Sequence, residues 1–427
     1  MEKLLMLGTS NASEEIINCA KSRGIFTVVT DYLPPEKSAA KLISDDYWMI
    51  STADLDALEA KCREEGITAV ISGVSEFNIG MSIELCKRLG LPCYTTQETW
   101  HYSVDKRAFK DMCIKNGVPV AQDYYVSTQP TEEELNKIKF PVVVKAIDQC
   151  ANKGMSYCYS KEEVIKACDY ARSFSKSETV IIEKMLKGRE YEAYYAIADG
   201  EVVLLDLSVM LKQPEDPEKY YLFSTTMSDG RDFFMREINT KLINLLKDMG
   251  CQEGVAWIQI MEDEDDGHLY AFEMGYRLTG DMIITPIGVS HNFDPYSWML
   301  DIAMGVKHSK EELIERNLTA NRTSYACSYI LWSTKGGVLS KIDSCDEIRK
   351  IPTVNITSAL MVGDKVEKRH QLAAVTFNAN DADEMIKIIK KVNDLEVFKI
   401  GDENVVVRYD DFENLKYMET ESKKESL

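Results

Sequence analysis

Two charged residues stand four positions apart at the end of an apolar segment. Residues 268–283 read HLYAFEMGYRLTGDMI, so Glu273 ends a predicted strand and Arg277 follows it. Gln259 lies in the preceding apolar run, fourteen residues before Glu273. If the two strands are antiparallel neighbours, an amide oxygen and a carboxylate can meet around one divalent cation. A guanidinium beside them can bind a transferring phosphoryl group or an acyl phosphate.

Two lysines upstream supply cations suited to phosphates. Lys106 begins a predicted helix, and Lys145 ends the apolar run PVVVK. Taken alone, Lys145 is more simply explained as a strand-end side chain that extends to water. The small polar loop DQCANKGM at 148–155, which contains Lys153 and Gly154, can fold its backbone N–H groups over phosphates. Surface turns have the same composition, so the loop is weak evidence by itself.

The strand predicted at 179–186 carries groups suited to an adenine and a ribose. Adjacent backbone groups in an extended segment can pair with the edge of the base, and an acid downstream can reach the ribose hydroxyls. The candidates are Glu183, Lys184, Met185 and Leu186 for the base and Glu190 for the ribose. The alternative is a surface hairpin with ordinary charges. Together with the lysines and the metal ligands, these groups meet the needs of ATP with magnesium.

Strand–helix alternation over residues 1–100 predicts βαβ units and an open parallel sheet. The strands are predicted at 3–8, 26–31, 68–73 and 91–94. Ligands of such sheets bind at the carboxyl ends of the strands. Glu76 lies at such an end and can bind an amino group, although an acid at the start of a helix explains it equally well. A nicotinamide-dependent oxidoreductase is disfavoured, because LGTSNAS after the first strand holds one glycine and the chain has no Walker A loop.

The composition of the chain limits the classes of binding partner that we expect. Seventy acidic and fifty basic residues give a net charge of −20. Such a surface repels nucleic acid and anionic membranes, so we expect neither as a partner. The eleven cysteines contain no C-x-x-C pair, and several lie at apolar helical positions. This pattern predicts buried free thiols in a reducing, cytoplasmic setting.

In the order of these parts, the sequence resembles the ATP-grasp superfamily over essentially its whole length. The layout is most similar to biotin carboxylase, the carbamoyl phosphate synthetase large chain, glycinamide ribonucleotide synthetase and bacterial L-amino acid ligases. The resemblance implies a mixed α/β and α+β fold with an N-terminal open parallel sheet, a central ATP-grasp domain with a mobile lid, and a C-terminal strand-rich α+β domain. The expected bounds are 1–104, 105–310 with the lid at about 120–186, 311–418, and a disordered tail at 419–427.

The resemblance also assigns roles. Lys106 and Lys145 look like the phosphate-binding lysines, and 148–155 like the lid loop. Glu183 through Leu186 look like the adenine hinge, with Glu190 on the ribose. The metal ligands are then Gln259 and Glu273, and the catalytic guanidinium is Arg277.

The chain departs from the family pattern at three of these positions. Most members have glutamate where Gln259 stands, although carbamoyl phosphate synthetases have glutamine. The asparagine and proline of the E-x-N-P-R signature are Gly275 and Tyr276 here. The asparagine is a magnesium ligand in the family, so its loss leaves open whether one or two metal ions bind.

The activity implied is an ATP-dependent carboxylate–amine ligase that forms a carbon–nitrogen bond through an acyl phosphate and releases ADP and phosphate. The implied cofactors are ATP and Mg²⁺ or Mn²⁺, the partners are a small carboxylate and an amine, and a homodimer is common among similar enzymes. Alternatives are a glycinamide ribonucleotide synthetase-like or carbamoyl phosphate synthetase-like activity. A further alternative is a non-catalytic ATP-binding sensor built on an ATP-grasp fold that has lost its activity.

Overall fold

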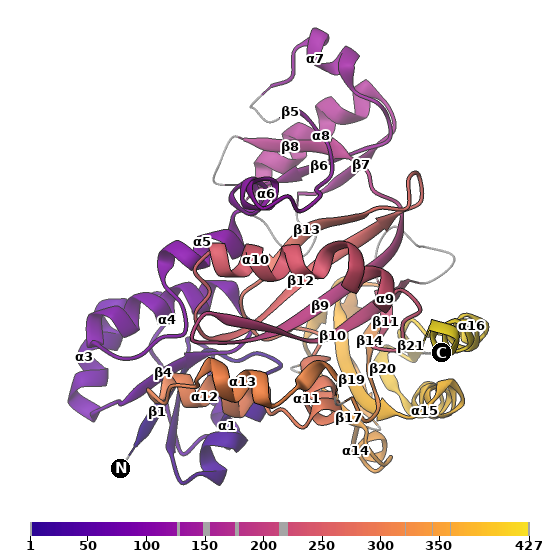
Figure 1. Ribbon diagram of the computed structural model, residues 1–427. Coiled ribbons are helices and arrows are strands. Elements are labelled where there is room, and N and C mark those ends of the chain that lie inside the picture. The colour runs from indigo at the N-terminus through magenta and orange to yellow at the C-terminus, as the bar shows by residue number, and fades with distance from the viewer. Residues whose placement is uncertain are drawn as a thin grey trace.

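A computed structural model describes residues 2–125, 129–147, 154–175, 179–212, 221–320, 322–343, 345–358 and 360–425 (Figure 1). The chain begins with a parallel four-stranded sheet in the order β3-β2-β1-β4. Its strands are β1 (Lys3–Leu7), β2 (Phe26–Thr30), β3 (Asp46–Trp48) and β4 (Ala69–Ser72). Its helices are α1 (Ser13–Ser22), α2 (Ala39–Ile43), α3 (Leu55–Glu65) and α4 (Glu76–Leu89), with α5 (Gln97–Val104) and α6 (Lys106–Lys115) leading out of the domain.

A small antiparallel sheet in the order β5-β8-β6-β7 stands apart from the rest of the molecule, at the top of Figure 1. Its strands are β5 (Asp123–Tyr125), β6 (Val142–Ala146), β7 (Ser156–Cys158) and β8 (Val180–Lys184). It is accompanied by α7 (Glu132–Lys137) and α8 (Lys161–Phe174). Val142 and Val144 pack with α8 in a core of their own, which makes this region a separate packing unit.

The large sheet has the order β13-β12-β9-β10-β11-β14-β19-β17. Its strands are β9 (Gly188–Ala198), β10 (Glu201–Lys212), β11 (Tyr221–Thr225), β12 (Gly254–Asp263), β13 (Leu269–Gly275), β14 (Tyr325–Trp332), β17 (Asn355–Thr357) and β19 (Gln371–Ala379). Strands β9 and β10 form the predicted hairpin, and its turn at Asp199 and Gly200 has positive φ at both residues. The C-terminal strands β14, β17 and β19 extend this sheet rather than forming one of their own.

Helices cover both faces of the large sheet because β9 is apolar on both. Tyr195 packs with Leu245 on one face, and Ala196 packs with Trp298 on the other. The covering helices are α9 (Arg231–Phe234), α10 (Thr240–Asp248), α11 (Ile284–His291), α12 (Pro295–Ala303) and α13 (Lys310–Glu315). The remaining elements are β15 (Gly337–Val338) with β18 (Lys365–Val366), β16 (Lys341–Asp343) with β20 (Val397–Ile400) and β21 (Glu403–Asn404), and α14 (Cys345–Arg349), α15 (Ala382–Leu395) and α16 (Phe412–Glu425).

The mixed α/β fold predicted from the sequence is confirmed, and two local predictions differ from the structure. Residues 91–94 form no strand: Pro92 lacks an N–H donor, and the Tyr94 hydroxyl instead donates to the Tyr276 carbonyl at 2.8 Å. Residues 419–425 belong to α16 instead of a disordered tail, because Leu415 and Met418 are buried and anchor that helix. Within the described ranges, no helix is both long enough and apolar enough to cross a bilayer.

Candidate active site

A cavity of about 720 Å³ lies where the small sheet, the large sheet and the carboxyl ends of β1 and β4 face one another. It brings together most of the residues that the sequence singled out: Glu76, Lys106, Lys145, Glu183, Lys184, Leu186, Glu190, Gln259, Glu273 and Arg277. Met185 and Gly154 do not line it, and Lys153 falls outside the described residues. The segments therefore converge although they are up to 201 positions apart in sequence.

Gln259 and Glu273 sit directly opposite each other in the antiparallel pair β12–β13. The Lys106 Nζ lies 3.2 Å from Glu273 Oε1. Burial alone would raise the pKa of Glu273, but the charges of Lys106 and Lys145 lower it, so the carboxylate is ionised at neutral pH. Among the described residues, no group of three or more His, Cys, Asp and Glu side chains is arranged to hold a metal ion. A cation here would therefore need further oxygens from a ligand such as a phosphate.

The orientation of Gln259 is fixed by Glu192, a residue that the sequence analysis missed. Gln259 Nε2 donates to Glu192 Oε2 at 2.9 Å. With the amide nitrogen directed at Glu192, the amide oxygen of Gln259 is left for a cation. A glutamate at 259 would put two carboxylates within hydrogen-bonding distance, which explains glutamine at this position. The available signal was the strand period of two, which puts Glu192 on the same face as Glu190.

Glu192 and Asp281 form a pair of buried carboxylates in this cavity. Burial and the charge of Asp281 raise the pKa of Glu192 to about 8. Burial likewise raises the pKa of Asp281. Asp281 was also missed, because it lies in the irregular segment between β13 and α11, where no periodicity predicts which side chains point inward.

Lys145 and Glu183 form an ion pair inside the small sheet. The Lys110 Nζ lies 2.9 Å from the other oxygen of Glu183. Burial alone would raise the pKa of Glu183, but Lys145 and Lys110 lower it. Lys145 therefore combines a structural contact with a position on the cavity wall, whereas Lys110 does not line the cavity.

The predicted adenine hinge has one free donor. The N–H groups of Lys184 and Met185 donate to the carbonyls of Gln122 at 2.8 Å and Pro141 at 3.2 Å. The Leu186 N–H has no hydrogen-bond partner among the described residues, and Leu186 lines the cavity. Of the N–H groups of Lys184, Met185 and Leu186, only that of Leu186 is thus available to a base in the part of the chain that the structure describes. Glu190 lines the same cavity, 2.9 Å from Lys212 Nζ.

Arg277 is held between an acid and an indole. Its Nη2 lies 3.3 Å from Glu76 Oε1, and its guanidinium stands 4.9 Å from the centre of the Trp257 ring. Glu76 thus faces the cavity as predicted, but part of its charge is already neutralised by Arg277. The cation–π contact with Trp257 aligns the guanidinium along the cavity wall.

Local packing explains why Gly275 and Tyr276 replace the asparagine and proline of the family signature. Trp257 pairs with Gly275 across β12 and β13. A Cβ on Gly275 would lie within 2.6 Å of Trp257 Nε1 and closer still to two ring carbons. Tyr276 is fully buried and stacks edge-on against Tyr94 at 5.2 Å. Gly275 and Tyr276 therefore each have a structural role, which a signature lost by random mutation would not give them.

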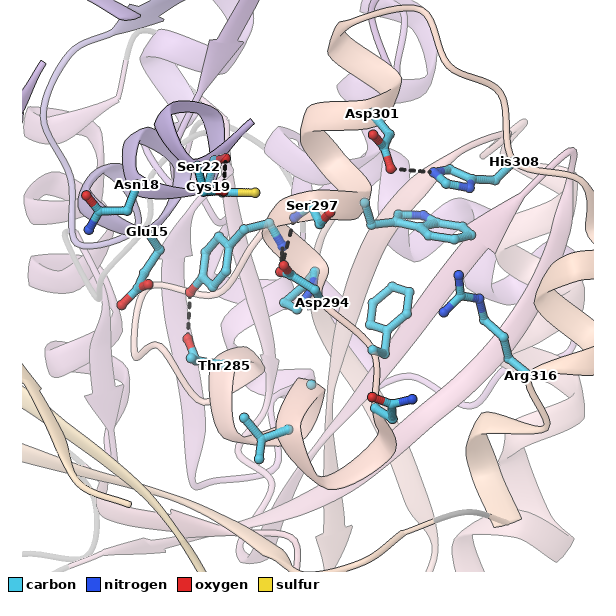
Figure 2. A pocket seen from close by; sticks show the side chains of 17 residues that line it. Glu15, Asn18, Cys19, Ser22, Thr285, Asp294, Ser297, Asp301, His308 and Arg316 are labelled. Carbon is cyan, nitrogen blue, oxygen red and sulfur yellow. Dashed lines mark hydrogen bonds and ion pairs between the residues drawn. The ribbon is translucent and has the colours of Figure 1, made fainter. Parts of the chain in front are cut away.

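A larger cavity of about 890 Å³ lies elsewhere, between α1, α11 and α12 (Figure 2). Its lining includes Asp294 and Asp301 but no lysine and none of the predicted site residues. In it, His308 stacks on Trp298 with ring centroids 3.6 Å apart. Arg316 lines this cavity, but the set of lysines and arginine that lines the other cavity and could bind the phosphates of a nucleotide has no counterpart here. His291, near the motifs in sequence, is buried against Asp206 at 3.0 Å and away from both cavities.

With the geometry established, sequence relatives can be compared. Residues 104–211 match the sequence model of the phosphoribosylglycinamide synthetase ATP-grasp (A) domain. A formate-dependent phosphoribosylglycinamide formyltransferase of Bacteroides thetaiotaomicron is 24% identical over 212 residues, which are 49% of this chain and 51% of that protein. The chain therefore spans about half the length of this curated relative.

Solved structures share the fold over nearly the entire chain. An L-amino acid ligase from Bacillus licheniformis superposes with a TM-score of 0.75 at 16% identity, covering 94% of this chain and 99% of that one. The biotin carboxylase domain of 2-oxoglutarate carboxylase from Hydrogenobacter thermophilus, solved with MgADP, ADP and bicarbonate, gives 0.73 at 17% identity and covers 99% and 94%. At these identities the likeness shows a common fold.

Proposed function

The chain is a member of the ATP-grasp superfamily, and from this premise we propose that it is an ATP-dependent carboxylate–amine ligase. The observation that carries the proposal is the convergence of Lys106, Lys145, Gln259, Glu273 and Arg277 on one cavity. These are the cations, hard oxygen donors and guanidinium that the transfer of a phosphoryl group requires.

The proposed reaction has two steps. A carboxylate oxygen of the substrate attacks the γ-phosphorus of ATP, the bond to the bridging oxygen breaks, and ADP leaves. The nitrogen of an amine then attacks the carbonyl carbon of the acyl phosphate. The carbon–oxygen bond to phosphate breaks, inorganic phosphate leaves, and the amine loses a proton. Both steps depend mainly on positioning and on neutralising negative charge.

The chain's own residues supply those functions. Lys106 and Lys145 neutralise phosphate oxygens, and the Leu186 N–H meets the base while Glu190 reaches the ribose. The carboxylate of Glu273 and the amide oxygen of Gln259 fit Mg²⁺ or Mn²⁺, which when bound would neutralise charge on the phosphates. Arg277 stabilises the charge on the acyl phosphate. The small sheet carrying Lys145 would close over the site and exclude water.

An ADP-release screen tests the class of activity. The purified protein with MgATP is expected to release ADP and phosphate in equal amounts when a mixture of amino acids and small carboxylates is added. A non-catalytic sensor would bind ATP and release no ADP with any mixture, and that result would remove the ligase proposal. The screen also identifies the substrates, because the mixture can be divided until one carboxylate and one amine remain.

Replacing Lys145 with methionine is expected to weaken ATP binding by about tenfold or more, since a charge-assisted contact to phosphate is lost. Equilibrium binding of ATP measures this. Lys110→Met is the matched control, because it removes the other cation from Glu183 without removing a charge from the cavity wall. If both variants weaken ATP binding equally, Lys145 acts only through the ion pair with Glu183.

We further propose a reducing, cytosolic setting and a homodimer. The cysteines that the structure describes are all free, including buried Cys113 and Cys251. The related biotin carboxylase domain named above was crystallised as a dimer. Light scattering in solution gives the mass, and a monomer at all concentrations would remove the second part of this proposal.

A further inference from the structure

Two acidic side chains of the cavity lack the cation that every other acid lining it has. Glu273 pairs with Lys106, Glu190 with Lys212 and Glu76 with Arg277. Glu183 pairs with two lysines. Within the described residues, Glu192 and Asp281 have no ion pair. Both line the same cavity, and the charge of Asp281 acts on Glu192.

Both side chains are almost completely removed from water. Glu192 is 5% exposed and Asp281 is 7% exposed. The groups that hydrogen-bond to them are neutral: the amide of Gln259 and the Tyr194 hydroxyl to Glu192, and the Thr279 hydroxyl and the Ile283 N–H, the latter at 3.3 Å, to Asp281. Burying two carboxylates that line one cavity without a cation is unfavourable unless one of them takes up a proton or a ligand brings a positive charge. The cavity wall therefore shows a deficit of positive charge at one place.

An independent observation indicates what else the ligand carries. Trp257 is 7% exposed and lines the same cavity, yet its Nε1 atom has no hydrogen-bond partner among the described residues. An indole N–H only donates, so it lacks an acceptor. Arg277 lies over the ring of Trp257 and adds positive charge beside it. A group with an acceptor oxygen, such as a carboxylate, fits this side of the cavity.

The remaining wall is aromatic. Tyr221 and Trp332 line the cavity, and Trp332 Nε1 donates to the Tyr221 carbonyl at 2.9 Å. Tyr221 lines the same cavity as Asp281 and Glu192, and the charges of both acids act on its hydroxyl. Aromatic faces beside carboxylates suit an organic ammonium ion better than a hydrated metal ion, which needs several more oxygen ligands.

Resting on the ligase proposed above, we infer that the amine substrate is an amino acid, bound as its ammonium ion at Glu192 and Asp281 with its carboxylate toward Trp257 and Arg277. The ammonium group gives one proton to these carboxylates before its nitrogen attacks the acyl phosphate. The site thus selects a zwitterion by charge at both ends. In this arrangement Glu192 contacts both the ammonium group of the substrate and the side-chain amide of Gln259.

The test compares amino acids with hydroxy acids of the same shape. L-Alanine and L-lactate, and L-phenylalanine and L-phenyllactate, differ mainly in an ammonium group against a hydroxyl. The twenty amino acids are titrated by calorimetry into the full chain with Mg²⁺ and a non-hydrolysable ATP analogue, and each one that binds is compared with the hydroxy acid that has the same side chain. At least one amino acid is expected to bind about tenfold or more tightly than its hydroxy acid, because the charge-assisted contacts are lost in the latter.

Asp281→Asn is expected to remove that preference while leaving the affinity for the ATP analogue unchanged. Asp232→Asn, on the exposed start of α9, is the control with the same chemical change. Glu192→Gln should also remove the preference, and a Mg²⁺ titration shows separately its effect through Gln259. Equal binding of amino and hydroxy acids, binding of no amino acid, or a preference that survives both variants overturns the inference.

The experiments distinguish a failure of the amino-acid site from a failure of the ligase proposal. Binding is measured without turnover, so absence of ADP release removes the ligase and leaves the amino-acid site standing. Turnover with a nucleophile that bears no ammonium group removes the amino-acid site alone. If Asp281→Asn instead abolishes binding of one Mn²⁺ ion and has no effect on amino acids, the carboxylates hold a metal and the inference is wrong.

Discussion

Replacing Glu273 with glutamine is expected to reduce magnesium-dependent ADP release by about a hundredfold or more, with little change in stability. Replacing a residue that contacts only a metal ligand typically costs 10- to 100-fold in activity. Because Glu273 is proposed to contact the metal directly, we expect a loss at or above the upper end of that range. Glutamine keeps the size of the side chain and its place opposite Gln259, but it removes the negative charge. The rate is measured across a range of Mg²⁺ concentrations, and part of the loss should be recovered at high Mg²⁺.

Glu264→Gln provides the control for this change. Glu264 lies in the exposed turn that joins the same two strands, so the substitution alters the net charge equally without touching the cavity. Thermal unfolding of both variants shows whether the fold is intact. A Glu273→Gln protein with the activity and Mg²⁺ dependence of the unchanged chain would falsify the metal assignment. It would leave Glu273 only as the ion-pair partner of Lys106.

The parts of the fold that sequence predicted well are those with long apolar runs. The apolar runs at 254–261 and 269–275 predicted β12 and β13, and the structure adds that Gln259 and Glu273 are opposite in register. The register of the two strands is set by which face of each strand is buried. A shift of one residue would turn the side chain at position 259 or 273 away from the cavity. Segment 91–94 was predicted wrongly, because a short apolar run containing Pro92 has no period to separate strand from loop.

The site was predictable where a residue type was unusual for its surroundings. A carboxylate ending an apolar strand drew attention to Glu273, and the family resemblance added Lys106 and Lys145. Glu192 looked like one acid among many, since its role depends on Gln259 in a neighbouring strand. Asp281 lies in irregular chain, where only coordinates show which way it points. Contacts between segments distant in sequence therefore account for most of what was missed.

The pairing of Trp257 with Gly275 changes the meaning of the altered signature. A lost metal ligand alone would favour a decayed site. The indole instead fills the space that a side chain at 275 would need, and it supports the guanidinium of Arg277. The substitution at Gly275 and the presence of Trp257 are thus one feature of the packing. A site that keeps its guanidinium oriented in this way is consistent with catalysis.

Restoring the family asparagine with Gly275→Asn is accordingly expected to harm the protein. The new Cβ would overlap the Trp257 indole, which is buried and could move aside only toward the cavity that it lines. Overpacking of this kind typically costs roughly 1–3 kcal/mol in the free energy of unfolding. Movement of the indole would also displace Arg277, so ADP release should fall together with stability. Urea unfolding and the ADP-release rate measure the two effects.

Making room for the asparagine separates packing from metal binding. In Trp257→Leu/Gly275→Asn the overlap is removed, so the double variant should be more stable than the sum of the two single changes predicts. An amide would then stand beside Glu273, and the Mg²⁺ concentration needed for half-maximal ADP release should fall relative to Trp257→Leu alone. If the two changes are instead additive in stability, the indole does not restrict position 275. The absence of asparagine would then need an explanation outside the packing of these two strands.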